Sequence, residues 1–323
     1  MLDLLIIGGS AAGSAASVYA SRRKLDFKII TTELGGEVAL SGDVGNWLGI
    51  ESIQGFELSQ NFQKHVKSYG AEIDEGFTVE KVEQKDHYHI VTAKNATGEE
   101  KTYETKTIII ATGIHPRHLE IPGEKEFDRK GITYCTVCDG PLFKDKITTT
   151  IGAGNSALES AIMMAGIAKK HYVITKYTDT KENNGGFPRG ENILIDKIKE
   201  MDNIEIIYGA NTTEILGSGM VTGLKYQTNA EPSSAKATVD KEEELETQGV
   251  MVHIGSIPNS DFIDNIEKDG GKQIVINQKC QTDIPGIFAA GDVTNIPYKQ
   301  IAIAVGQGVI AGLSSIEYIN KWK

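Results

Sequence analysis

The chain has 323 residues, of which 40% are hydrophobic and 7% aromatic, and its formal net charge is −11. This length suggests two domains rather than one continuous core. The acidic balance disfavours nucleic acid as a partner, because phosphates select basic surfaces, and the short apolar runs flanked by charges predict no membrane span.

A strand, a glycine-rich turn and a helix are predicted at the beginning of the chain. Residues 3–8 form an apolar run, the turn covers residues 8–13, and residues 27–32 read as the next strand. This βαβ order is the one in which a helix N-terminus binds the pyrophosphate of a dinucleotide. Ser10 stands in place of the middle glycine, and its small side chain hinders that approach only slightly. The first strand lacks the basic segment of a signal peptide and cysteines are few, so we expect a cytoplasmic protein.

Two further apolar strands end in small or polar residues. Residues 107–113 close with Ala-Thr-Gly, and residues 286–292 close with Gly-Asp. Ligands of open α/β sheets bind at the carboxyl ends of the strands, so both ends are candidate binding positions. Considered alone, Asp292 fits a helix cap or a turn equally well.

Two cysteines three positions apart, Cys135 and Cys138, are followed directly by Asp139. This spacing is typical of a redox couple or of half a metal site. A structural zinc site would need a second ligand pair, whereas the only other cysteine is Cys280. Two buried, inert cysteines are compatible with the spacing, although Asp139 and Gly140 argue against a core strand. We therefore interpret the pair as a redox-active dithiol.

A second βαβ unit follows the dithiol. The strand at residues 147–151 leads into the turn at 152–157, then into an apolar helix through Met164 and a strand at 171–175. A single glycine turn is weak evidence, but two copies, each between a strand and a helix, predict two bound dinucleotides.

These motifs, in this order, resemble the low-molecular-weight thioredoxin reductases, and equally the catalytic core of the flavoprotein subunit of alkyl hydroperoxide reductase. The resemblance covers nearly the whole chain. It is carried by the first glycine turn, Gly35-Gly36-Glu37, Asn46-Trp47, Ala111-Thr112-Gly113, Pro116-Arg117, Ile121-Pro122-Gly123-Glu124, the Cys-Asp-Gly block, Gly291-Asp292 and Tyr298-Lys299-Gln300-Ile301. Lys299 with Ile301 is closer to the peroxide-reductase branch.

The resemblance implies an α/β fold with two Rossmann-like dinucleotide-binding domains, the second inserted into the first. Residues 1–117 and 248–323 would form the FAD-binding domain, and residues 118–247 an NAD(P)-binding-like domain that carries the dithiol. The implied activity is FAD-dependent disulfide reduction, with electrons passing through the dithiol to thioredoxin or a thioredoxin-like protein. The resemblance also implies a homodimer and rotation of the inserted domain between two states.

Roles for individual residues follow from the same resemblance. Cys138 is the sulfur nearer the flavin, Cys135 attacks the disulfide of the partner, and Asp139 is the general acid or base. The residues expected to bind FAD are Gly8, Gly9, Ser10, Ala11, Ala12, Gly13, Thr32, Glu33, Gly35, Gly36, Glu37, Asn46, Thr112, Gly113, Gly291, Asp292, Lys299, Gln300 and Ile301. Those expected at the nicotinamide nucleotide are Gly152, Gly154, Asn155, Ser156, Ala157, Lys176 and Arg189. Glu33 is either a ribose ligand or a surface carboxylate, and Glu37 stands where the family usually has Gln.

The electron donor is less clearly indicated. Relatives that use NADPH usually have an arginine cluster after the strand that ends near Ile174, whereas this chain has Thr-Lys-Tyr and a long polar loop. Lys176 and Arg189 are candidates to replace the cluster in part, and solvated loop charges are the alternative. NADPH and NADH both stay open, as do reduced ferredoxin as donor, a dithiol oxidase, and a redox-inactive flavoprotein that senses nicotinamide. The intact dithiol and Asp139 speak against the last of these.

Overall fold

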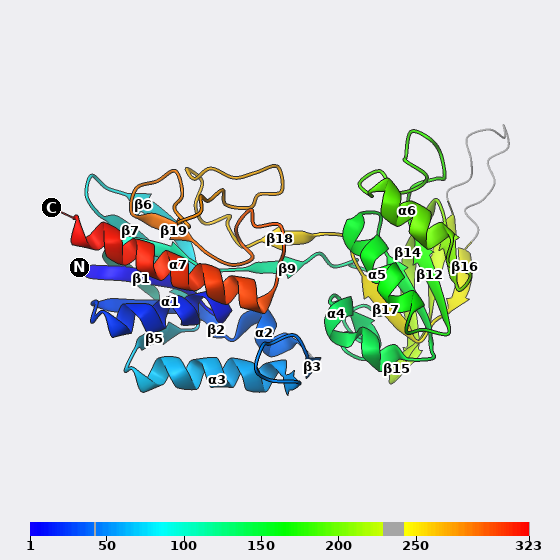
Figure 1. Ribbon diagram of the computed structural model, residues 1–323, viewed down its shortest axis with the longest axis horizontal. Coiled ribbons are helices and arrows are strands. Elements are labelled where there is room, and N and C mark those ends of the chain that lie inside the picture. The colour runs from blue at the N-terminus through cyan, green and yellow to red at the C-terminus, as the bar shows by residue number, and fades with distance from the viewer. Residues whose placement is uncertain (42, 229–241, 323) are drawn as a thin grey trace. The chain divides into compact units, whose positions relative to one another are not determined.

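The computed structural model describes residues 1–41, 43–228 and 242–322 of the chain (Figure 1). The described chain divides into two compact units, Met1–His115 with Ile257–Lys323, and Pro116–Ser256. Each unit has a sheet with a core of parallel strands and with helices packed beside it, so the predicted α/β class with two Rossmann-like units is confirmed.

The first unit is built on a seven-stranded sheet in the order β5-β2-β1-β8-β7-β6, with β19 also paired to β8. Its strands are β1 (Leu2–Gly9), β2 (Phe27–Leu34), β5 (Glu72–Glu75), β6 (Phe77–Gln84), β7 (His89–Asn95), β8 (Glu100–Ile110) and β19 (Ile287–Ala289). Strands β5, β2, β1, β8 and β19 run parallel, whereas β6, β7 and β8 pair antiparallel. Leu4, Leu5 and Ile6 are fully buried because helices and loops cover both faces of β1, which explains its continuous apolar run.

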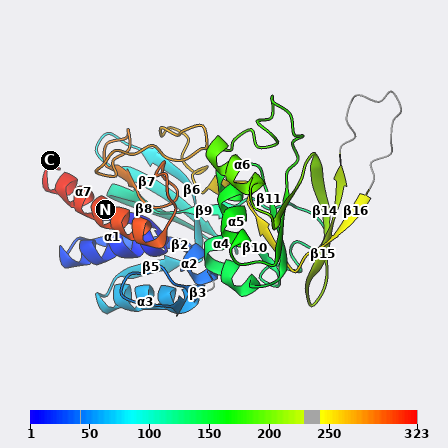
Figure 2. The same ribbon diagram turned by 45° about the vertical axis from the view of Figure 1, so that its right-hand side comes forward.

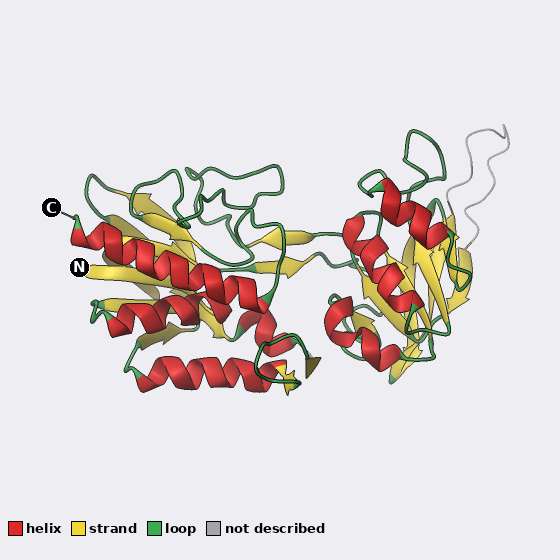
Figure 3. Cartoon of the chain, viewed as in Figure 1, coloured by secondary structure: helices red, strands yellow, loops and turns green. Residues whose placement is uncertain are grey.

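Helices pack beside this sheet (Figure 3). They are α1 (Ala11–Arg22), α2 (Gly36–Leu40), α3 (Gly55–Ser68) and α7 (Ile301–Asn320). A two-stranded ribbon of β3 (Asp43–Val44) and β4 (Ile53–Gln54) lies between α2 and α3 in the chain. Helix α7 lies along α1, and a Cβ atom at Gly308 would come within 2.1 Å of the carbonyl oxygen of Ala12. Glycine at this position allows the two helices to approach closely.

By length and composition alone, α7 could cross a membrane, with a mean hydropathy of 1.4 over its most apolar window. The expectation that no segment meets this criterion is therefore wrong. The packing of α7 on α1 accounts for its apolar composition, because Ala304, Ala311 and Ile316 are buried inside the unit.

The second unit has a five-stranded parallel sheet in the order β10-β17-β11-β12-β13, and a three-stranded antiparallel sheet in the order β14-β15-β16 (Figure 2). The strands are β10 (Ile132–Thr133), β11 (Ile147–Ile151), β12 (Lys170–Ile174), β13 (Ile204–Ile207), β14 (Ala210–Ser218), β15 (Met220–Thr228), β16 (Glu242–Glu246) and β17 (Gly249–Val252). The helices are α4 (Thr136–Asp139), the short 3-10 helix η1 (Gly140–Phe143), α5 (Asn155–Ala165) and α6 (Asn192–Lys199). The glycine turn between β11 and α5 is the second predicted βαβ start.

The chain crosses between the units twice, through β9 (Ile114–Pro116) and β18 (Ser256–Pro258), which pair with each other. The sequence placed the second crossing at residues 247/248, whereas the compact units divide at 256/257. This boundary is corrected because β17 pairs with β10 and β11 and so belongs to the sheet of the second unit.

Candidate active site and cofactor sites

The first glycine turn joins β1 to α1, and two of its glycines have no room for a side chain. Gly8 has φ of +116°, and a Cβ there would lie 2.2 Å from the carbonyl oxygen of Ala111. A Cβ on Gly13 would lie 1.9 Å from the carbonyl oxygen of Gly8. Ser10 is the N-cap of α1, and its hydroxyl donates to the carbonyl of Gly35 at 2.6 Å. The Ser10 hydroxyl therefore bonds to Gly35, and the backbone N–H groups at the start of α1 are left to bind a phosphate.

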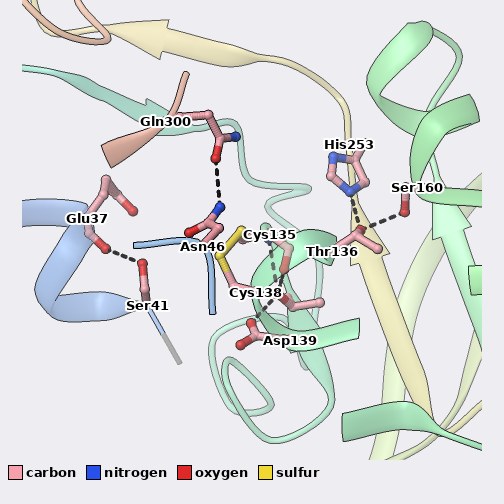
Figure 4. The surroundings of a disulfide bond; sticks show 11 residues. Glu37, Ser41, Asn46, Cys135, Thr136, Cys138, Asp139, Ser160, His253 and Gln300 are labelled. Atoms are coloured by element: carbon pink, nitrogen blue, oxygen red, sulfur yellow. Dashed lines mark hydrogen bonds between the residues drawn. A yellow bond between two sulfur atoms is a disulfide. The ribbon is translucent and has the colours of Figure 1, made fainter. Parts of the chain in front are cut away.

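The predicted residues after β2 lie beside this turn. The N–H of Gly35 donates to the carbonyl of Gly9 at 3.1 Å, and both Gly35 and Gly36 have positive φ. Glu37 lies in the first turn of α2, where its carbonyl accepts a bond from Ser41 at 2.9 Å (Figure 4). The sequence did not single out Thr31, whose hydroxyl accepts from Gly9 N–H and so ties β2 to the turn.

Thr32 and Glu33, also predicted for FAD, are exposed at the end of β2. The hydroxyl of Thr32 bonds that of Thr78 at 3.1 Å, and the carbonyl of Glu33 accepts from the Thr31 hydroxyl at 2.7 Å. The end of β2 therefore stays next to the turn, and the Glu33 side chain is accessible from solvent.

Gly291 and Asp292 follow β19 at the carboxyl edge of the same sheet. Gly291 has φ of +79°, and its N–H donates to Gln307 Oε1 at 2.8 Å. In the part of the chain that the structure describes, the buried Asp292 Oδ1 has no hydrogen-bond partner. Burial raises the pKa of Asp292 to about 6, with Lys299 opposing this. A buried acceptor without a donor fits a hydroxyl-bearing ligand, and with the glycine turn it makes the first unit suitable for FAD.

Lys299 and Gln300 extend this edge. The Lys299 ammonium donates to the carbonyl of Thr294 at 2.6 Å and to Gln273 Oε1 at 3.2 Å, and burial lowers its pKa. Asn46 Nδ2 donates to Gln300 Oε1 at 3.0 Å (Figure 4). The fold thus joins two predicted residues that are far apart in the chain, just before Ile301 begins α7.

Thr112 and Gly113 are held by a residue that the sequence did not reveal. The Thr112 hydroxyl donates to the carbonyl of Asn259 at 2.6 Å, and Asn259 Nδ2 donates to the carbonyl of Thr112 at 2.9 Å. The N–H of Asn259 also donates to the carbonyl of Gly113, and its Oδ1 lies 2.7 Å from His115 Nδ1. Asn259 follows a proline in an ordinary loop sequence, which gives no signal of this role.

The dithiol of the second unit is a disulfide between Cys135 and Cys138, with a Cα–Cα distance of 5.3 Å (Figure 4). Cys135 is the N-cap of α4, and its carbonyl accepts from the N–H groups of Cys138 and Asp139 at 3.1 and 3.0 Å. Of the two residues between the cysteines, Thr136 is buried and Val137 is 57% exposed. One side of the loop is therefore anchored and the other is open.

Asp139 is tied to the first cysteine through Thr133, the last residue of β10. The Thr133 hydroxyl donates to Asp139 Oδ2 at 2.5 Å and accepts from the N–H of Cys135 at 3.1 Å. Thr133 is only 4% exposed, so the carboxylate is held from the interior of the unit. Nothing in the sequence marks Thr133 for this role, because threonine in a buried strand is ordinary.

The second glycine turn has the same build as the first. Gly152 has φ of +155°, and a Cβ there would lie 2.3 Å from the carbonyl oxygen of His253. Gly154 is the N-cap of α5 and forms a backbone bridge with Arg189. In α5, Ala157 is fully buried and Ser156 is exposed.

Asn155 and Glu191 close this second turn. Asn155 Nδ2 donates to Glu191 Oε1 at 2.9 Å, and the N–H of Glu191 donates to Asn155 Oδ1 at 2.8 Å. The backbone bridge between Gly154 and Arg189 places Arg189, one of the two cationic residues predicted for the nucleotide, next to this turn. Lys176 is exposed, with Nζ 5.4 Å from the ring centroid of Tyr177. The sequence did not predict the carboxylate of Glu191 here.

Comparison with known proteins agrees with these features. The profile of the family described as pyridine nucleotide-disulphide oxidoreductase matches residues 2–308. An alkyl hydroperoxide reductase subunit of Xanthomonas campestris pv. phaseoli is 35% identical over 319 residues, which are 98% of this chain and 57% of that protein. The chain thus spans under six-tenths of the length of that relative.

Solved structures match the chain over its whole length. Thioredoxin reductase from Streptococcus pyogenes MGAS5005 is 32% identical, with a TM-score of 0.83 and 99% of each chain covered. A ferredoxin-flavin thioredoxin reductase from Clostridium acetobutylicum is 29% identical, with a TM-score of 0.51, 99% of this chain and 98% of that one covered.

The described residues include two glycine turns, the buried Asp292 Oδ1 without a hydrogen-bond partner at the sheet edge, and a disulfide. These features fit a flavin-dependent disulfide oxidoreductase. Its cofactor is FAD, and it is an oxidoreductase. The chain therefore belongs to the pyridine nucleotide-disulphide oxidoreductase family, as a thioredoxin reductase-like FAD-dependent disulfide oxidoreductase.

Proposed function

We propose that this protein reduces the disulfide of thioredoxin or of a thioredoxin-like protein through the Cys135–Cys138 pair. The observation that carries the proposal is the disulfide itself, formed across a loop with a buried side at Thr136 and an exposed side at Val137. The match to thioredoxin reductases over nearly the whole chain supports the same acceptor class.

When bound, FAD supplies a carrier that takes up a hydride and gives two electrons to a disulfide. Reduction of the Cys135–Cys138 bond requires two electrons and two protons and yields two thiols. One thiol must lose its proton to attack a partner disulfide, because the thiolate is the nucleophile. In our proposal Cys135 attacks, as the family resemblance implies, and Cys138 stays on the FAD side of the exchange.

We assign the proton transfer to Asp139. Its carboxylate follows Cys138 directly, and Thr133 holds Oδ2 in place through a hydroxyl bond while also accepting from Cys135 N–H. A carboxylate fixed in this way can take or return the thiol proton without first losing side-chain freedom.

For the electron donor we propose a nicotinamide nucleotide bound at the turn of residues 152–157, with weak discrimination between NADPH and NADH. Arg189 reaches this turn through the bridge to Gly154, whereas Lys176 is exposed beside Tyr177. One arginine offers a single bidentate fork to a 2′-phosphate, where an arginine cluster would offer several. Reduced ferredoxin is the second candidate, favoured by the absence of an arginine cluster after β12 in the sequence.

Burial raises the pKa of the Cys280 thiol to about 11, so this third cysteine is poorly reactive. The Cys135–Cys138 pair is then the redox centre, which suits the reducing cytoplasm that we propose as the compartment.

We also propose that the protein is a homodimer, as the family resemblance implies. Gel filtration with light scattering tests the dimer directly.

Anaerobic titration tests the donor and the acceptor together. The FAD-loaded protein is titrated with NADPH, NADH or reduced ferredoxin while flavin absorbance is followed, and oxidised thioredoxin is then added and its thiols are counted. We expect bleaching by a nicotinamide nucleotide and two thiols per thioredoxin. Cys135→Ser and Cys138→Ser are the matched controls and should bleach without producing thiols. A wild-type protein that bleaches and leaves thioredoxin oxidised would refute the acceptor.

A further inference from the structure

The buried side of the dithiol loop is attached to the interior by a chain of hydrogen bonds. Thr136, between the two cysteines, is 3% exposed. Its hydroxyl oxygen lies 2.6 Å from Ser160 Oγ in α5 and 2.7 Å from His253 Nε2, which follows β17 (Figure 4). The loop is thus held from two sides through one side chain.

The chain of hydrogen bonds continues from Ser160 through the core of the second unit. Ser160 Oγ lies 2.9 Å from Thr150 Oγ1, and Thr150 Oγ1 lies 3.0 Å from His171 Nε2. His171 Nδ1 lies 2.7 Å from Thr148 Oγ1. These bonds therefore link α4, α5, β11 and β12, and every member except His253 is less than 5% exposed.

The members of this chain of hydrogen bonds depend on one another. Each hydroxyl has one proton, so it can donate to one neighbour while it accepts from the other. Burial lowers the pKa of His171 to about 3, so its imidazole is neutral and donates through one nitrogen and accepts through the other. When every hydroxyl donates to another member, all bonds point the same way along the chain, and removal of one member leaves a buried neighbour without that bond.

We propose that this chain of hydrogen bonds positions the dithiol, with His253 and Ser160 holding Thr136 so that the reduced Cys135 and Cys138 stay close enough to form a disulfide again. The proposal rests on the redox role assigned to this pair under the proposed function. In the oxidised protein the covalent bond itself restrains the loop, whereas in the reduced protein the hydrogen bonds of Thr136 do so. Thr136 and His253 are positioning residues that act on the sulfurs through the backbone.

Loss of the anchor should make the disulfide easier to reduce. The reduced loop would gain conformational freedom that the oxidised loop does not have, and freeing one residue is equivalent to a factor of about 5 to 30 in the equilibrium. The change is measured with glutathione: the protein disulfide and two glutathione thiols give the protein dithiol and glutathione disulfide, a balanced exchange of two electrons and two protons. Acid quenching, thiol labelling and mass spectrometry of the FAD-loaded protein give the ratio of the two forms.

Four variants test the inference. Thr136→Val removes both hydrogen bonds of the anchor and should shift the equilibrium about 5- to 30-fold toward the dithiol. His253→Phe removes one of the two and leaves the bond to Ser160, so its shift should have the same direction and be smaller. His253→Gln keeps a donor and an acceptor for Thr136 and should shift it less than His253→Phe. Thr149→Val is the matched control: Thr149 is also buried in β11, but its hydroxyl donates to Thr247 at 3.0 Å and is not part of the chain of hydrogen bonds.

Two results would overturn the inference. One is an unchanged equilibrium in His253→Phe, which decides the matter even if Thr136→Val fails to fold. The other is an equal shift in Thr149→Val, which would show a general effect of disturbing β11. The measurement needs neither thioredoxin nor a nicotinamide nucleotide. If the proposed acceptor or donor proved wrong, the result of this measurement would therefore still decide the inference.

Discussion

The carboxylate of Asp292 makes the stability of the FAD-free protein dependent on pH. Its Oδ1 is buried and has no hydrogen-bond partner within the described part of the chain, and burial raises its pKa from 3.8 to about 6. Between these two values the folded protein holds a proton that the unfolded chain has lost. The free energy of unfolding therefore falls as the pH rises from about 4 to 6, and the loss is complete above the folded pKa.

The Asp292→Asn variant lacks this titrating group, so its difference from the wild type in the free energy of unfolding measures the cost of the buried carboxylate. A pKa difference of about two units corresponds to about 3 kcal/mol when the carboxylate is fully ionised. We expect the FAD-free variant to be about 3 kcal/mol more stable than the wild type at pH 7.5, and about 1 kcal/mol more stable at pH 4.5. With FAD bound the advantage should shrink, because the ionised carboxylate then has a donor to accept from.

Urea unfolding of both proteins at the two pH values, followed by far-ultraviolet circular dichroism, measures these differences. Asp261→Asn is the control for loss of a negative charge, because Asp261 lies in the same unit and its side chain is 71% exposed. If the gap between the Asp292 variant and the wild type were the same at pH 4.5 and 7.5, the reasoning about the buried carboxylate would be refuted.

Three further predictions concern the remaining sites. Cys135→Ser and Cys138→Ser should each abolish thioredoxin reduction while flavin bleaching by the donor persists, and near-normal turnover in a stopped assay of either variant would contradict the assigned relay. The wild type should prefer NADPH over NADH by less than about tenfold in kcat/KM, because Arg189 offers only one bidentate fork, and combined Lys176→Ala and Arg189→Ala should remove that preference; a strong NADPH preference that survives both changes would place the phosphate site elsewhere. Gly13→Ala should prevent FAD retention, since its Cβ would lie 1.9 Å from the carbonyl oxygen of Gly8, and a yellow variant with one FAD per chain would be unexpected.

The features that could be predicted from the sequence are the local ones. An apolar strand that ends at Gly8 and a small-residue helix after Gly13 specify a tight turn within a few residues, and the structure shows why a Cβ is excluded at both. The dithiol is equally local, because a spacing of three residues lets Cys135 and Cys138 meet across one turn of chain.

The residues that the sequence did not reveal act through contacts between distant parts of the chain. Asn259 holds Thr112 across 147 positions and His253 holds Thr136 across 117 positions. Asparagine and histidine in such segments are ordinary, and their partners are defined only once the strands have paired. The misplaced boundary at residues 247/248 has the same cause, since the pairing of β17 with β11 cannot be read from either segment alone.

The two glycine turns begin with the same local pattern and differ in what closes them. At the first sheet edge the buried Asp292 Oδ1 has no partner within the described residues, so a ligand with hydroxyl groups removes an existing penalty when it binds. At the second turn Glu191 already pairs with Asn155 at the start of α5, and its carboxylate repels phosphates that would bind at the same helix N-terminus. Binding is therefore expected to be tight at the first turn and weak at the second. Tight binding at the first turn is what a permanently bound FAD needs, and weak binding at the second is what an exchanging nucleotide needs. The difference arises from Asp292 and Glu191, and not from the glycine patterns.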